Sequence, residues 1–121
     1  HPDNASSVYD WLNTALGTQY TTALVIGGTK IDVDVVGKDS TNNNAAIFIA
    51  NDKNISTLAD TTKYTLLKTT NNQPIIIDRT LSSSTISKTL ADTIKDDDLT
   101  NIGLKKVCSG ATCQISKKAA E

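Results

Sequence analysis

The sequence predicts an α+β domain, in which an antiparallel sheet built from hairpins packs against two helices. Three observations lead to this prediction: β-branched runs bounded by turn residues, two segments with helical apolar spacing, and strands that do not alternate regularly with helices. The chain has 121 residues, the size of one domain. Because no repeat or linker divides it, we expect a single domain over residues 1–121, with flexible tails at 1–6 and 116–121.

The first predicted element is a helix over residues 7–17. Ser7 can cap its beginning, and Gly17 can end it in the left-handed conformation. The apolar residues that share one face of this helix are Val8, Trp11, Leu12, Ala15 and Leu16. Trp11 is expected to anchor the core or a protein interface, with a ligand platform as the alternative.

Antiparallel hairpins are expected in the middle of the sequence. Two glycines, Gly27 and Gly28, separate an apolar run at 23–26 from an alternating run at 29–36, which is typical of a tight hairpin turn. Further strands are expected at 45–50, 63–69 and 75–78, with surface loops at 37–44, 51–54 and 71–74. Residues 55–61 show no clear period and stay unassigned.

A second helix is expected near 84–95, because Ile86, Leu90 and Ile94 recur every four residues after a serine cluster. Three acids, at 96–98, follow this segment. Acids at a helix C-terminus oppose the helix dipole, so we expect the helix to end there. Residues 104–115 then read as a closing hairpin.

The only cysteines, Cys108 and Cys113, flank the turn of that closing hairpin. A hairpin with this loop can place them directly opposite each other, which predicts a structural disulfide. Two free thiols, or a redox or metal role, are the alternatives. The C-x4-C spacing does not favour zinc, because no further cysteine or internal histidine can complete the ligand set. A disulfide predicts a secreted protein in an oxidising compartment, which is extracellular, at the cell surface or periplasmic.

Composition and charge exclude two further classes of partner. The net charge is −1, so there is no basic surplus to bind the phosphates of a nucleic acid. No stretch approaches the roughly 20 apolar residues of a membrane span.

The chain starts at His1 rather than methionine, and we expect it to be a mature or truncated fragment.

Candidate catalytic and metal-binding residues are few. The only histidine is His1, at the end of the chain, where an imidazole is poorly positioned for catalysis. Asp32 and Asp34 share one face of a strand and could work as an acid–base pair, but their alternation with apolar residues places them in solvent. The acids at 96–98, with Asn101, could bind calcium or simply be solvated. We therefore expect no enzyme, no catalytic residue, no metal and no cofactor.

The layout resembles the globular head of a type IV pilin. The matching features are the amphipathic segment at 7–16, the middle rich in hairpins, and Cys108 and Cys113 near the end. The resemblance implies a helix packed on an antiparallel sheet, with a C-terminal segment closed by a disulfide, in a subunit that assembles with copies of itself. No motif matches residue by residue, so no functional residue is carried over.

The predicted function is a non-enzymatic extracytoplasmic subunit, structural or adhesive, with a pilin-like head as its most specific form. The alternative is a secreted or periplasmic module for protein binding, such as an inhibitor, a small toxin or the sensory domain of a receptor. A hydrolase that uses aspartates is a third hypothesis. The partner is a second copy or a different protein. The residues expected at the contact are Trp11, Asn42, Asn43, Asn44, Ser109, Gly110, Ala111 and Thr112.

Overall fold

The computed structural model describes residues 20–59 and 62–118 and corrects the predicted fold class. Strands hold 51% of these residues and helices only 9%, so the fold is mostly antiparallel β rather than α+β. The expected helix at 7–17, including Trp11, lies outside the described residues. The elements are β1 (Tyr20–Ile26), β2 (Thr29–Lys38), β3 (Ala45–Ala50), β4 (Tyr64–Lys68), β5 (Pro74–Asp78), β6 (Ser83–Ser87), α2 (Lys88–Ala91), α3 (Asp96–Thr100), β7 (Leu104–Ser109) and β8 (Thr112–Lys117).

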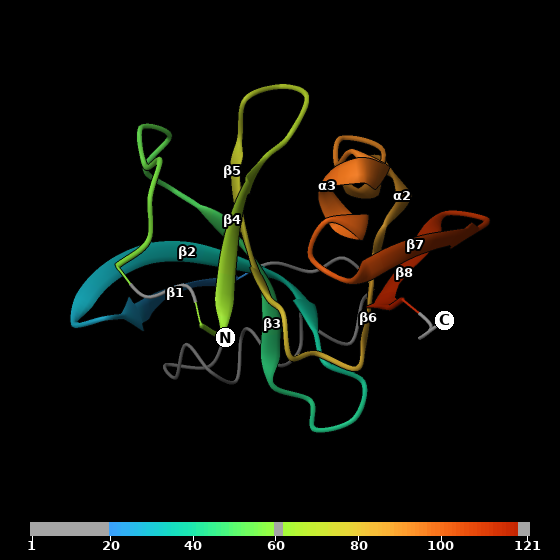
Figure 1. The fold of residues 1–121 in the computed structure, drawn as a ribbon, viewed down its shortest axis with the longest axis horizontal. Helices are drawn as coiled ribbons and strands as arrows, with labels where there is room; N and C mark the ends of the chain where they lie inside the picture. Colours follow the sequence, from blue (N-terminus) through green and yellow to red (C-terminus); the bar gives the residue numbers. More distant parts are fainter. Residues whose placement is uncertain (1–19, 60–61, 119–121) are drawn as a thin grey trace, which may run out of the picture.

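The strands form two antiparallel sheets, with the order β1-β2-β3-β5-β4 in the first and β6-β8-β7 in the second. Figure 1 shows the β1–β2 hairpin reaching out on one side of the central strands, with the second sheet and both helices on the other side. The predicted hairpin at Gly27 and Gly28 is confirmed. Both glycines have positive φ, 57° and 80°, as a primed two-residue turn requires.

The helix expected near 84–95 is the second prediction that the structure corrects. Residues 83–87 form strand β6, and only four residues, Lys88–Ala91, form the helix α2. Along β6, Ser84 and Ile86 point into the core, which is the alternation of a strand. Pairing of Ile86 with Cys113 on β8 holds this segment extended. A β-branched stretch next to a partner strand thus overrides the four-residue apolar spacing.

The acids at 96–98 begin a helix instead of ending one. They lie in the first turn of α3, where the positive end of the helix dipole favours carboxylates. The turn before α3 is stabilised by Lys106, whose Nζ donates to the carbonyls of Ala91 and Ile94, each at 2.8 Å. The Lys106 ammonium also lies 3.3 Å from the carboxylate of Asp96.

Both faces of the first sheet carry buried apolar residues. The core between this sheet and the second sheet contains Val36, Ala46, Ile47, Ile75, Ile77, Leu81, Ile86, Ala91, Ile94, Leu99, Leu104, Cys113 and Ile115. The core on the opposite face contains Ile26, Ile31, Val33, Val35, Phe48, Ala50 and Ile76, with Ile55 and Leu58 packed against it. Because β3 and β5 contribute to both cores, they read as continuous apolar runs.

A polar cluster joins the β2–β3 loop to the connection between β5 and β6. The buried carboxylate of Asp39 accepts hydrogen bonds from the Ser82 hydroxyl at 2.6 Å and from the Thr41 amide at 3.0 Å. The Ser40 amide donates to the Ser83 carbonyl at 2.8 Å. We call Asp39, Ser40, Thr41, Ser82 and Ser83 the Asp39 clasp.

Candidate functional site

An open cavity of about 600 Å³ lies between the beginning of β2 and the segment 51–59. Its apolar lining comes from Ile31, Ile55, Leu58 and Ala59, and its polar lining from Thr29, Lys30, Asp32, Asn51, Asp52 and Thr57. This volume is within the range of sites that bind small ligands or short peptides. We call it the β2 cavity.

The segment 51–59 is fixed at both ends of the cavity. At one end the Asn51 amide donates to the Asp32 carbonyl at 2.9 Å, directly after β3 ends. The chain then turns at Asp52, whose carboxylate accepts the Asn54 amide at 2.9 Å. At the other end Ala59 contacts Gly27, where a Cβ would come within 2.7 Å of the Ala59 Cβ. The cavity is therefore a slot with two closed ends.

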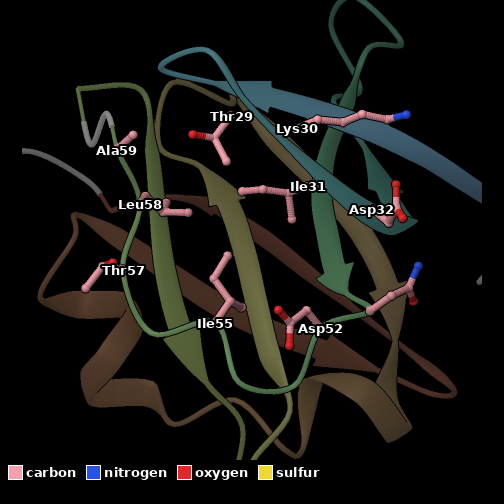
Figure 2. A pocket seen from close by; sticks show the side chains of 10 residues that line it. Thr29, Lys30, Ile31, Asp32, Asp52, Ile55, Thr57, Leu58 and Ala59 are labelled. Atoms are coloured by element: carbon pink, nitrogen blue, oxygen red, sulfur yellow. The ribbon is translucent and has the colours of Figure 1, made fainter.

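The centre of the cavity is apolar and its rim is charged. Figure 2 shows Ile31, Ile55 and Leu58 pointing toward one another from β2 and from the segment 51–59. Ile31 is buried, whereas Ile55 and Leu58 are half-buried. The side chains of Lys30 and Asp32 lie away from this centre (Figure 2), and both are exposed. An apolar centre surrounded by a few polar groups is typical of a recognition site.

A second groove, of about 370 Å³, lies beside α2 and the β4–β5 turn. Three of its four hydroxyl groups are used within the protein. The Thr69 hydroxyl donates to the Asn71 side chain, the Ser87 hydroxyl accepts the Leu90 amide, and the Thr93 hydroxyl donates to the Leu90 carbonyl. Because these groups already have partners, the groove has fewer hydrogen-bonding groups left for a ligand than the β2 cavity has.

The expected contact loops lie apart from each other and from the β2 cavity. The asparagines at 42–44 are exposed in the β2–β3 loop, where the Asn44 amide donates to the Asn42 side chain at 2.9 Å and Asn43 has a φ of 60°. Residues 109–112 close the hairpin between β7 and β8, far from that loop in Figure 1, with Thr112 half-buried and the other three exposed. The structure therefore does not bring the two loops into one site.

The predicted disulfide between Cys108 and Cys113 is confirmed, with the two residues directly opposite each other on β7 and β8. Cys113 is buried in the core between the sheets, whereas Cys108 is exposed. The hairpin turn also supports α2, because the Ala111 carbonyl accepts the Lys88 amide at 2.9 Å. The disulfide is compatible with an extracellular or periplasmic location.

The acids that the sequence singles out are separated by the fold. Asp32 lines the β2 cavity, whereas Asp34 accepts a hydrogen bond from the Thr21 hydroxyl at 2.6 Å. Within residues 20–59 and 62–118, no group of three or more His, Cys, Asp or Glu side chains is placed to hold a metal ion. In the same residues, no helix has the length and apolar character needed to cross a bilayer.

Sequence reasoning missed the apolar residues at the centre of the cavity. Ile55 and Leu58 lie in the segment that showed no period, and their apolar character among polar neighbours was the one available signal.

No family model, no curated protein and no solved structure matches this chain. The geometry of the described residues is thus the basis for a functional proposal.

Proposed function

We propose that this chain is a non-enzymatic extracytoplasmic subunit, structural or adhesive, that acts by binding another protein through the β2 cavity. The observation that supports this proposal is the apolar centre formed by Ile31, Ile55 and Leu58 at the surface. Apolar side chains that converge in an open slot gain free energy when a partner covers them, about 25 cal/mol per Å² of apolar surface buried.

The rim of the cavity suits recognition of a protein. Asn51, Thr29 and Thr57 offer amide and hydroxyl groups, and Asp32 and Asp52 offer carboxylates. These groups are exposed, so a partner can exchange their hydrogen bonds to water for direct ones. The disulfide supports the extracytoplasmic part of the proposal, because such bonds persist in oxidising compartments.

A pilin-like head is the more specific form of this proposal, and a secreted or periplasmic binding module is the alternative. The five-stranded antiparallel sheet and the C-terminal disulfide hairpin support the first form. The two forms differ in the partner, which is a second copy in a pilin and a different protein in a binding module. One experiment distinguishes them.

The experiment places a photo-crosslinking amino acid, p-benzoylphenylalanine, at Leu58 or at Thr29 in the protein expressed in its own host. The matched control carries it at Gln114, which is exposed on the outer face of the second sheet. We expect adducts from Leu58 and Thr29 and none from Gln114, and mass spectrometry of the adduct identifies a second copy or a different protein. Circular dichroism checks that each variant folds.

Two outcomes overturn the proposal. Adducts from Gln114 as abundant as those from Leu58 and Thr29 would mean that the β2 cavity has no special part in binding. No adduct from either cavity position, in folded protein, would mean that the cavity is not an interface.

A further inference from the structure

The main chain of β2 directs part of its hydrogen-bonding groups into the β2 cavity. Next to a two-residue turn, the closing pair of a hairpin exchanges both hydrogen bonds, and here this pair is Ile26 and Thr29. Near the turn, the residues of β2 whose main chain bonds to β1 are therefore Thr29 and Ile31. Lys30, between them, directs its amide and carbonyl away from β1, toward the side on which β3 lies. The bond from the Asn51 amide to the Asp32 carbonyl agrees with this alternation.

Strand β3 ends before it reaches Lys30. Its last residue, Ala50, lies opposite Val33, and the chain then turns away from β2 after Asn51. The Lys30 main chain therefore faces the cavity with no main-chain partner among the described residues. Since unpaired main-chain groups must otherwise bond to water, this is a free section of sheet edge.

The opposite wall has free main-chain groups too. The Ile55 amide donates to the Asp52 carbonyl, but no main-chain hydrogen bond joins Ser56, Thr57 or Leu58 to another residue within the described ranges. A chain placed between Lys30 and this segment could thus bond to both walls. An extended peptide has donors and acceptors on both of its edges, so it fits this arrangement.

The closed ends limit the length of the peptide. From Thr29, next to the Gly27–Ala59 contact, to Asp32, whose carbonyl accepts the Asn51 amide, β2 advances by three residues, or about 10 Å at roughly 3.3 Å per residue. That distance corresponds to about three or four extended residues, so the terminal side chains of a pentapeptide reach the rim. A volume of about 600 Å³ agrees with a peptide of this size rather than with a folded domain.

We propose that the β2 cavity binds a short extended segment of a partner protein, which pairs with Lys30 as an added strand in continuation of β3. This inference rests on the proposed function and names its ligand. Apolar side chains of the segment cover Ile31, Ile55 and Leu58. A basic side chain at one end of the segment faces Asp52 and Asp32, because these two carboxylates outnumber the single ammonium of Lys30 in the lining.

The test measures fluorescence anisotropy of labelled pentapeptides Lys-Xaa-Thr-Xaa-Lys, with Xaa as Val, Ile, Leu or Phe, against the full oxidised chain. Each peptide is compared with a version N-methylated at both Xaa positions, which removes main-chain donors and keeps the side chains. We expect the unmodified peptide to bind at least tenfold more tightly than its methylated version. Leu58→Asp should weaken binding at least tenfold, and Gln114→Asp should leave it unchanged.

A second readout follows the main chain directly. Hydrogen exchange of the Lys30 amide, observed by NMR, should slow on addition of the peptide, because that amide becomes bonded to the added strand. The Val25 amide is the control, since it points outward from the edge strand β1, away from β2, and should exchange at the same rate with and without peptide.

The possible failures are distinguishable. Equal affinity of the methylated and unmodified peptides, or no change at the Lys30 amide, overturns strand addition. If no peptide binds while the Leu58 and Thr29 crosslinks persist, the proposed function stands and the peptide ligand is wrong. If the crosslinks are also absent, both proposals fall.

Discussion

At Gly37 the first sheet meets the second without room for a side chain. A Cβ at this position would collide with the Ser84 hydroxyl and would lie 3.0 Å from Ile86 and 3.3 Å from Ile47. The Ser84 hydroxyl is itself buried and has no hydrogen-bond partner among the described residues. Glycine is thus required here by contact between the sheets and not by a left-handed backbone.

This arrangement predicts opposite effects for two alanine substitutions. Gly37→Ala should lower the free energy of unfolding by about 1–3 kcal/mol, because it overpacks the contact. Ser84→Ala should be neutral or stabilising, since it removes a buried hydroxyl that has no partner. The double variant should recover part of the loss, as measured by urea denaturation. A Gly37→Ala protein as stable as wild type would contradict this account.

At the scale of elements, patterns that depend on neighbouring residues were predictive. The run at 45–50 is confirmed as β3, and the glycine pair as the β1–β2 turn, because apolar continuity and positive φ are local requirements. The helix near 84–95 was wrong for the opposite reason. Ile86 belongs to a strand and Leu90 to a helix, and only pairing with β8, almost 30 residues away in sequence, decides this.

The disulfide hairpin supports α2, which gives a prediction at the same scale. The short loop between Cys108 and Cys113 corresponds to about 2 kcal/mol of stabilisation in the chain-entropy description. Replacement of both cysteines by alanine should lower the free energy of unfolding by about this amount. Exchange of the Lys88 amide, which donates to the Ala111 carbonyl, should accelerate more than exchange of the Ile76 amide in the first sheet. Equal acceleration would mean that the hairpin does not support α2.

At the scale of the molecule, the candidate site could not be predicted from the sequence. Its two walls, β2 and the segment 51–59, are separated in the chain by β3. They are brought together by the hydrogen bond from Asn51 to Asp32, by the contact of Ala59 with Gly27 and by the packing of the segment on the core. The predicted contact loops at 42–44 and 109–112 were chosen for their exposure, which is a local property. A cavity depends on how distant segments pack, and no local pattern encodes that.

The Asp39 clasp links the connections of the two sheets, and it predicts how the stability of the molecule depends on pH. The Ser82 hydroxyl, with the Thr41 amide, holds the pKa of the Asp39 carboxyl below its ordinary value. An unfolded chain has an Asp pKa of about 3.9. The clasp therefore stabilises the folded state above that pH, and this contribution is lost as the pH falls through the lower pKa of the folded state.

Asp39→Asn should accordingly lower the urea midpoint at pH 7, because an amide cannot accept all of these hydrogen bonds as a carboxylate does. The difference between wild type and variant should shrink as the pH is lowered from 5 to 2, where the wild-type carboxylate also becomes protonated. Asp32→Asn, at an exposed position of β2, is the control and should stay close to wild type throughout. A difference for Asp39→Asn that is constant with pH would show that the carboxylate charge does not hold the two connections together.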